Sequence, residues 1–294
     1  MEYIPAKHLL HRSKSTEWFG TDHTMNLYRG CCHGCLYCDS RSACYQNPDF
    51  DRVKAKADAL RLLRDDLARK AKPAFITMGS MSDPYNPFEE ELQLTRHALE
   101  LIDAYQCGVA AATKSDLIVR DVDLYRLIQD HSPVICKLTV TTTDDALAEK
   151  IEPHAPPPGR RLRALEELAK AGIFSGVLLM PVLPYVEDSA ENVLSVVDSA
   201  ARAGARFVYA AFGVTMRDGQ RDYFLNGLDR AFPGMGERYR KRYGSRYYCS
   251  SPKAKELWEL FSSRCRELGL LYEMKHIISA ATRNYEDRQL SFFE

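Results

Sequence analysis

Residues 31–38 read Cys-Cys-His-Gly-Cys-Leu-Tyr-Cys, and the rest of the chain is organised around them. Cys31, Cys35 and Cys38 are spaced C-x3-C-x2-C within this stretch. Three thiols so close together indicate a metal centre, because soft thiolate ligands select iron–sulfur clusters, zinc or Cu(I). A [4Fe–4S] cluster normally takes four cysteines. Three from one loop therefore leave one iron open for another ligand.

Zinc is the alternative metal, with Cys32 or His33 as a further ligand. Structural zinc sites usually combine one close pair of ligands with a second close pair, and no second pair follows in this sequence. Disulfide bridges are disfavoured, because the nine cysteines are preceded by no export signal. The spacing thus favours an iron–sulfur cluster, and zinc stays open as the alternative.

The composition is that of an ordinary globular protein. Of the 294 residues, 45% are hydrophobic and 27% are charged. The 40 basic and 40 acidic residues cancel, so no overall charge directs the chain to nucleic acid or membrane. The N-terminal residues 1–8 lack the apolar core of a signal peptide, and the longest apolar run, 176–186, is too short to span a bilayer. We therefore expect a cytoplasmic protein with no membrane partner.

Short apolar runs alternate with helical patterns after residue 23. The expected strands are 24–29, 74–78, 108–113, 134–140, 176–182 and 207–212, and the expected helices are 52–71, 92–105, 122–128, 162–169 and 193–201. This alternation predicts a parallel sheet with helices outside. A closed eightfold barrel takes about 250 residues, and only six units fit before residue 213. We therefore predict an α/β fold with a partial (β/α)6 TIM-like barrel.

Three segments follow from this pattern. Residues 1–22 are expected to be a lead-in that packs on the barrel, and residues 23–213 to be the barrel itself. Residues 214–294 are expected to form a C-terminal extension that covers its open side. Within the extension, 214–252 show little periodicity, 257–268 indicate a helix, and 270–274 are typical of a strand. The last residues, 288–294, are expected to be a partly ordered tail.

The stretch Asn26-Leu-Tyr-Arg-Gly-Cys-Cys-His-Gly-Cys-Leu-Tyr-Cys38 resembles the cluster loop of radical S-adenosylmethionine (SAM) enzymes. It is most similar to the branch related to spore photoproduct lyase, a DNA repair enzyme. The resemblance implies a [4Fe–4S] cluster on Cys31, Cys35 and Cys38, with SAM chelating the open iron. It also implies an external one-electron reductant, flavodoxin-like or ferredoxin-like, and a 5′-deoxyadenosyl radical made by reductive cleavage of SAM. Tyr37 matches the position that packs beside the adenine.

Polar residues follow the expected strands, at the end where α/β barrels carry their chemistry. They are Gly79, Ser80, Ser82 and Asp83 after the second strand, Lys114 after the third, and Thr139, Thr141 and Thr142 after the fourth. Turn formation, a solvated lysine and strand propensity explain these residues equally well. The resemblance implies contacts of the first group with SAM, a pairing of Lys114 with the SAM carboxylate, and a hydroxyl contact from one of the threonines.

Two further motifs match the same family. Glu152-Pro is followed by a helix that begins near Arg161, so the two side chains could form an ion pair near the cofactor. A plain salt bridge at the start of a helix, which stabilises a protein little, is the alternative. Met180-Pro-Val-Leu-Pro184 matches the fifth-strand motif that passes near the adenine.

The family pattern fails at one place. Spore photoproduct lyases carry a cysteine just before the acidic turn, where it returns a hydrogen atom to the repaired thymine. Residues 79–82 read Gly-Ser-Met-Ser here, and serine is a poor hydrogen-atom donor because its O–H bond is stronger than S–H. Photoproduct repair therefore does not follow from the resemblance. Cys249, Cys32 and Cys44 are candidate donors, and Tyr248 is a candidate radical relay.

Residues 238–248 read Arg-Tyr-Arg-Lys-Arg-Tyr-Gly-Ser-Arg-Tyr-Tyr, with five basic residues among four tyrosines. Basic side chains contact phosphates and aromatic rings stack on bases, although a solvated helix face has a similar pattern. We predict a radical SAM enzyme, lyase-like, that acts on DNA or RNA. A radical SAM modifier of a peptide or small metabolite is the alternative, followed by a zinc-stabilised nucleic-acid-binding protein. The oligomeric state is not predicted.

Overall fold

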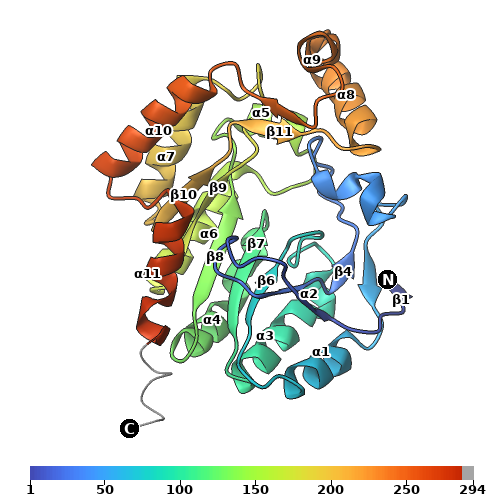
Figure 1. The fold of residues 1–294 in the computed structure, drawn as a ribbon, viewed down its shortest axis with the longest axis vertical. Helices are drawn as coiled ribbons and strands as arrows, with labels where there is room; N and C mark the ends of the chain where they lie inside the picture. Colours follow the sequence, from blue (N-terminus) through green and yellow to red (C-terminus); the bar gives the residue numbers. More distant parts are fainter. Residues whose placement is uncertain (287–294) are drawn as a thin grey trace.

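The structure, a computed structural model, describes residues 1–286 and is built on a seven-stranded sheet in the order β10-β9-β8-β7-β6-β3-β2 (Figure 1). The strands are β2 Leu10–Arg12, β3 His23–Met25, β6 Phe75–Met78, β7 Gly108–Thr113, β8 Val134–Thr139, β9 Ser175–Leu179 and β10 Phe207–Ala210. Six of them run parallel, and β2 joins the edge antiparallel to β3. Because β10 and β2 stay at opposite edges, the predicted partial barrel is confirmed.

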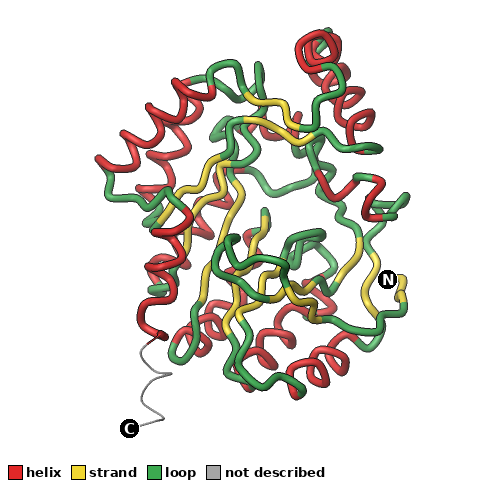
Figure 2. The backbone as a smooth tube through the Cα atoms, in the orientation of Figure 1, coloured by secondary structure: helices red, strands yellow, loops and turns green. Residues whose placement is uncertain are grey.

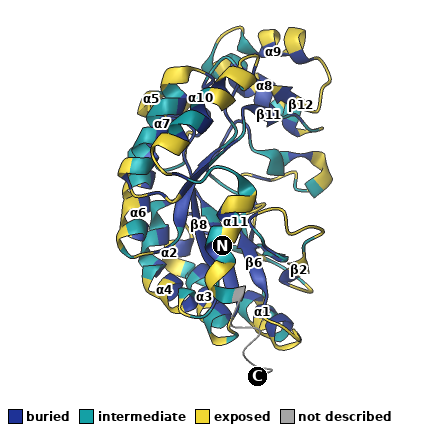
Figure 3. Cartoon of the chain, turned by 60° about the vertical axis from the view of Figure 1, so that its left-hand side comes forward, coloured by how far each residue is buried: buried dark blue, intermediate teal, exposed yellow. Residues whose placement is uncertain are grey.

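Helices cover the outer face of this sheet, and the strands line the inside (Figures 2 and 3). The covering helices are α1 Ala59–Ala68, α3 Leu94–Ala104, α4 Val122–Gln129, α6 Pro158–Lys170 and α7 Ala190–Arg202. The short helices α2 Glu89–Leu92 and α5 Asp145–Ile151 and 3-10 turns at Asp39–Arg41, Ala43–Tyr45 and Asp116–Asp121 lie in the connections. Each long helix buries one apolar face, as its 3.6-residue period predicts. Leu63, Leu99 and Leu165 are fully buried examples.

The inner face of the sheet is lined by small and polar side chains near the strand ends. Side chains alternate between the two faces of a strand, so β7 directs Val109 and Ala111 to the helices, and Ala110 and Ala112 to the inside. Alanine leaves space that a larger residue would fill. The sequence of β7 therefore keeps the inside of the barrel hollow at the end where the chemistry is expected.

Two expectations for the first third of the chain are wrong. The expected helix 52–71 begins only at Ala59, because residues 54–56 form strand β5 (Lys54–Lys56) between β1 (Glu2–Ile4) and β4 (Tyr28–Arg29). Ala55 is buried while the flanking lysines reach solvent, an alternation typical of a strand. The expected strand 24–29 is likewise split, since β3 belongs to the main sheet and β4 to this smaller sheet.

Residues after the barrel contain more regular structure than the sequence indicates. They form β11 Gly213–Thr215, α8 Gln220–Ala231, α9 Met235–Tyr243, β12 Tyr248–Ser250, α10 Ala254–Glu267 and α11 Met274–Glu286. The expectation of little periodicity over 214–252 is wrong, because α8 and α9 bury apolar residues against the loop at Leu36. The expected strand 270–274 is reduced to one bridge between Leu271 and Phe207. The expected tail 288–294 lies outside the described residues.

α10 packs beside α7, and α8 and α9 lie together at the end of the molecule near β11 (Figure 1). Within residues 1–286, no helix has the length and apolar character needed to cross a lipid bilayer.

Candidate cluster and cofactor site

A cavity of about 810 Å³, the main cavity below, opens inside the barrel at the carboxyl ends of the strands. Of the site residues predicted from the sequence, it is lined by Cys31, Cys35, Tyr37, Cys38, Gly79, Ser80, Ser82, Asp83, Lys114, Thr139 and Tyr248. Thr141, Arg161 and Cys249 do not line it. The fold thus brings predicted site residues from five separate segments to one space.

The cluster loop, residues 30–38, is held in place by its backbone. The Cys31 N–H donates to the Phe50 carbonyl at 2.8 Å, and the Leu36 N–H donates to the Ile151 carbonyl at 2.9 Å. Gly30 has a φ of +84°, and a Cβ there would lie 2.6 Å from the Phe50 carbonyl oxygen. Only glycine fits this backbone, so Gly30 fixes the direction in which the loop enters the cavity.

The three predicted cluster ligands, Cys31, Cys35 and Cys38, are free thiols that line the main cavity. Residues 1–286 hold no group of three His, Cys, Asp or Glu side chains gathered tightly enough for a single metal ion. In a [4Fe–4S] cluster each cysteine binds its own iron, so three thiols that line one cavity without forming a single-ion site fit a cluster. Cys32, by contrast, lines a different pocket of about 650 Å³ beside His154.

Glu152 is the centre of a buried charged group beside the cluster loop. Its carboxylate lies 2.6 Å from Nη1 of Arg161 and 3.9 Å from Nζ of Lys114, and it accepts a hydrogen bond from the Tyr37 hydroxyl. Burial by itself raises the pKa of Glu152, but the charges of Arg161 and Lys114 outweigh it and lower that pKa. The predicted ion pair of Glu152 with Arg161 is therefore present, and it is buried.

Arg161 is buried behind the cavity wall and does not line the cavity itself. Its guanidinium also donates to the Thr139 carbonyl at 3.0 Å and to the Pro156 carbonyl at 2.6 Å. It therefore fixes the end of β8 and the turn after Glu152, whereas Lys114 faces the cavity. Burial lowers the pKa of Lys114, but the electrostatic influence of the neighbouring Cys35 and Glu152 outweighs this and raises it. Lys114 thus keeps its positive charge within the cavity.

The acidic turn, residues 82–85, ties the end of β6 to the end of β7. Asp83 accepts hydrogen bonds from the Thr113 hydroxyl at 2.6 Å and from the Lys114 N–H at 2.9 Å. His33 of the cluster loop lies 3.4 Å away from the same carboxylate. The Asp83 carboxylate therefore aligns Lys114 and the cluster loop, in addition to lining the main cavity.

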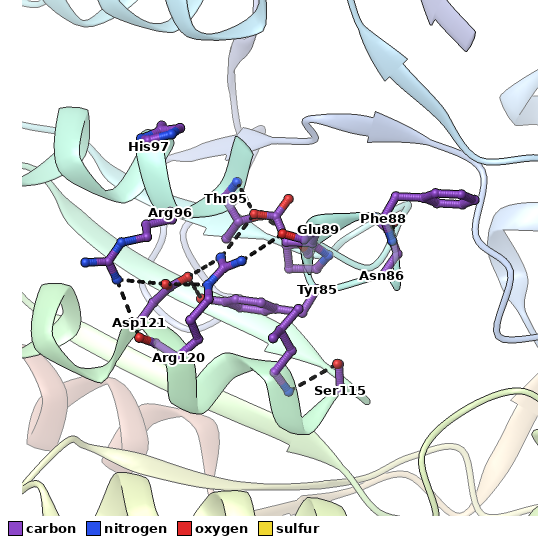
Figure 4. Close-up of polar contacts among 12 residues, drawn as sticks. Tyr85, Asn86, Phe88, Glu89, Thr95, Arg96, His97, Ser115, Arg120 and Asp121 are labelled. Carbon is purple, nitrogen blue, oxygen red and sulfur yellow. Dashed lines mark hydrogen bonds and ion pairs between the residues drawn. The ribbon is translucent and has the colours of Figure 1, made fainter. Parts of the chain in front are cut away.

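A second buried charged network lies behind the acidic turn (Figure 4). Arg120 lies 3.1 Å from Glu89 and 2.7 Å from Asp121, Arg96 lies 3.0 Å from Asp121, and the Tyr85 hydroxyl donates to Asp121 at 3.1 Å. Both carboxylates are fully buried. Sequence reasoning missed this support, because the charged residues stand at unrelated positions that only the packing of α2, α3 and the 3-10 turn Asp116–Asp121 brings together.

Gly79 lets the strand end approach its neighbour very closely. Its φ is +88°, and a Cβ would lie 2.1 Å from the Ala112 carbonyl oxygen. The backbone of β7 cannot move away, because it is paired on both sides within the sheet. Gly79 therefore forms a narrow backbone cradle at the cavity wall, of the kind that admits a ligand close to main-chain atoms.

Replacing Gly79 by alanine is expected to destabilise the protein more than the same change at Gly172. Gly172 also has a positive φ, +76°, but nothing lies within 4 Å of its Cβ position. Gly172→Ala should lower the free energy of unfolding by about 1–2 kcal/mol, and Gly79→Ala by about 1 kcal/mol or more beyond that. Urea denaturation of both variants measures the difference, and equal losses would contradict the cradle.

Of the remaining residues predicted from the sequence, some line the main cavity and others lie outside it. Among the three threonines, Thr139 lines the main cavity, Thr141 is buried outside its lining, and the Thr142 hydroxyl accepts from the Asp144 N–H. On β12, Tyr248 faces the cavity, and Cys249 on the opposite side is packed in the apolar core.

The other candidate thiols also lie away from the cavity. Cys44 is exposed and Cys32 lines the separate pocket. Across residues 1–286, the thiols that line the main cavity are those of the three cluster cysteines.

The basic and aromatic stretch 238–248 does not act as one surface. Tyr239 and Tyr243 are buried in the core, while the five basic residues of the stretch are exposed. Tyr247 and Tyr248 are the exposed rings, and Arg217, which the sequence did not single out, lies with its guanidinium 5.4 Å from the Tyr247 ring. Arg217 and Tyr248 line the main cavity, at the part called its mouth below, whereas Tyr247 and Arg217 line an adjoining pocket.

Comparisons with known proteins agree with this geometry. Residues 25–209 match the family model described as the radical SAM superfamily. An uncharacterised protein of Mycobacterium tuberculosis is 32% identical over 228 residues, which cover 75% of this chain and 67% of the relative. An uncharacterised protein of Methanocaldococcus jannaschii is 31% identical over 169 residues, which cover 58% and 63%.

Two kinds of solved structure have a similar fold. Spore photoproduct lyase in complex with a dinucleoside spore photoproduct superposes with a TM-score of 0.65 at 16% identity, covering 92% of this chain and 81% of the lyase. The radical SAM methyltransferase TsrM from Kitasatospora setae, with cobalamin and a [4Fe–4S] cluster bound, gives 0.57 at 12% identity, covering 90% and 61%. At sequence identities this low, the similarity shows a shared fold alone.

Proposed function

This chain belongs to the radical SAM superfamily, and from that premise we propose that it is a radical SAM enzyme acting on a nucleic-acid substrate. The observation that carries the proposal is the main cavity, which joins the three cluster cysteines to a mouth of basic and aromatic side chains. The enzyme class follows from the family. The substrate class rests on the chemistry of the mouth.

The residues of the cavity fit the two groups that the family implies. Cys31, Cys35 and Cys38 would hold a [4Fe–4S] cluster, and Gly79 with Lys114 would hold SAM, whose carboxylate suits the lysine charge. When bound, the cluster and SAM together supply a 5′-deoxyadenosyl radical. The protein contributes position and shielding: Glu152 holds Lys114 and Tyr37 on one wall, and Asp83 aligns the strand ends on the other.

The mouth of the cavity supports a nucleic-acid substrate. Arg217 forms an ion pair with Asp39 at 2.9 Å and lies against the rings of Tyr45 and Tyr247 at 5.8 and 5.4 Å. An arginine between tyrosines can contact a phosphate while an adjacent base stacks on a ring. Tyr248, which lines the wall, is the candidate relay for returning a hydrogen atom, because no thiol besides the cluster cysteines lines this cavity among the described residues.

Two measurements on the anaerobically reconstituted protein test the proposal. Reduction in the presence of SAM should release 5′-deoxyadenosine, and a single-stranded DNA or RNA oligonucleotide should change the rate. Binding of the oligonucleotide should weaken with salt, and Arg217→Ala should reduce the slope of log K against log salt by about 0.7, the value for one phosphate contact on a single strand. Lys170→Ala, on the far side of the sheet, should leave the slope unchanged.

Two outcomes would contradict part or all of the proposed function. Release of 5′-deoxyadenosine without any salt-sensitive binding of DNA or RNA would favour the peptide or small-metabolite alternative. Stoichiometric zinc, with no cleavage of SAM, would contradict the enzyme itself.

A further inference from the structure

Lys137 is a buried lysine on the inner face of the barrel. It lies on β8, two residues before Thr139, and only 1% of its surface is exposed. A strand rises about 3.3 Å per residue, so Lys137 lies roughly 7 Å deeper than the strand end. It lines the main cavity. Its ammonium group therefore faces the interior of the cavity, below the level of the residues assigned to SAM.

No carboxylate of residues 1–286 neutralises Lys137. The two aspartates that share the cavity are already engaged, Asp83 with Thr113 and the Lys114 N–H, and Asp39 with Arg217 and the Thr215 hydroxyl. The adjacent Cys136 belongs to the opposite, helix-facing side of the strand. The amine lies over the ring of Phe19, with Nζ 4.3 Å from the ring centroid.

A buried charge without a partner destabilises a fold, since its desolvation is not compensated. Burial accordingly lowers the pKa of Lys137 to about 7. A methionine or leucine would fill the same space at lower cost, and the neighbouring residues Ile135 and Leu178 are apolar. The lysine is therefore better explained by a ligand than by packing.

The surroundings of the amine indicate what kind of ligand it would meet. The ring of Phe19 contacts the rings of Trp18 and Tyr209, at centroid distances of 4.9 and 6.0 Å. Trp18 also lines the main cavity and is 39% exposed. A cation over a ring that itself contacts an accessible indole suits an anionic group that is carried beside a planar ring.

We infer that Lys137 is a substrate-binding residue, which holds an anionic group of the substrate, a phosphate or a carboxylate, in the interior of the main cavity. This inference rests on the proposed function for its cavity and deepens it by naming the group that the substrate must carry. The two lysines then bind different ligands at different depths of the cavity. Lys114, at the strand end beside Glu152, would bind SAM, and Lys137, which lies deeper, would bind the anionic group of the substrate.

The test is equilibrium dialysis of three probes with the reconstituted protein. Thymidylyl-thymidine carries one phosphodiester between two planar bases, thymidine carries no charge, and N-acetylglutamate carries carboxylates. The proteins are the wild type, Lys137→Met, Lys137→Arg and the control Lys170→Met, whose lysine is exposed on α6. We expect the wild type to bind one of the anionic probes about tenfold or more tightly than thymidine, and Lys137→Met to lose that preference.

Two further readouts separate this role from a structural one. Lys137→Arg should keep part of the preference, because it keeps the charge. Lys137→Met should melt at the same or a higher temperature than the wild type, since it removes an unpaired buried amine. A loss of anion binding together with unreduced stability cannot come from misfolding.

Each result of the dialysis decides something. Preference for thymidylyl-thymidine that depends on Lys137 supports both this inference and a nucleic-acid substrate. Preference for N-acetylglutamate that depends on Lys137 supports the inference and contradicts the nucleic-acid substrate. Anion binding that Lys137→Met leaves unchanged, or no preference for either anion, overturns the inference, while 5′-deoxyadenosine release measured in parallel still reports on the enzyme class.

Discussion

Alanine at Cys31, Cys35 or Cys38 is expected to abolish both the bound iron and the cleavage of SAM. All three thiols line the main cavity, and each would bind a separate iron. No other cysteine of residues 1–286 lines the cavity to replace a lost ligand. Because each ligand is needed, the loss should be complete in all three variants rather than graded.

Cys32→Ala is the matched control for this experiment. Cys32 is the immediate neighbour of Cys31, but it lines the separate pocket beside His154. It should retain about four iron and four sulfide per chain after anaerobic reconstitution, together with wild-type release of 5′-deoxyadenosine. Iron analysis and chromatographic detection of 5′-deoxyadenosine measure both quantities. A Cys32→Ala variant without a cluster would show that the ligand assignment is wrong.

Glu152→Gln is expected to cost about 3–5 kcal/mol of unfolding free energy, the range for breaking a buried ion pair. Glutamine has nearly the same shape, but it leaves the charge of Arg161 buried and unpaired. Arg161 is 1% exposed, so water cannot compensate. Chemical denaturation at neutral pH measures the loss, and the binding of SAM should weaken as well, because Lys114 loses its partner on the cavity wall.

Glu167→Gln is the control, because Glu167 pairs with Lys170 at 3.0 Å on the exposed side of α6. An exposed pair contributes about 0–1 kcal/mol. Equal losses in the two variants would contradict the importance of the buried group around Glu152.

The pH dependence of stability gives an independent check on Glu152. Its pKa is lower in the folded protein than in the unfolded chain, where a glutamate titrates near 4.3. The unfolded state therefore binds the proton more readily, so the stabilisation is present above about pH 4.3 and is lost as the pH falls through the folded pKa. Wild type should lose stability more steeply than Glu152→Gln below that pH. Equal losses of stability in the wild type and in Glu152→Gln below about pH 4.3 would contradict this expectation.

The sequence by itself determined the cluster loop and the class of the fold. The three cysteines lie within one short loop, so their spacing is a local property that a pattern can carry. The alternation of apolar strands and amphipathic helices is local as well, and it predicted the parallel, incomplete barrel. The helical pattern of apolar residues was misleading where pairing with distant strands overrode it. Lys54–Lys56, for example, forms a strand rather than the first turn of a helix.

Only the tertiary structure decided which side chains meet. Tyr37, Lys114 and Arg161 converge on Glu152 from separate segments, and the packing of the cluster loop and α6 at the strand ends, rather than sequence spacing, brings them together. The fold also places Cys249 in the core and Tyr248 at the cavity, since neighbours on a strand face opposite sides. Lys137 could not be recognised from the sequence for the same reason. Only the fold shows that this lysine of an apolar strand points into the barrel and has no acidic partner there.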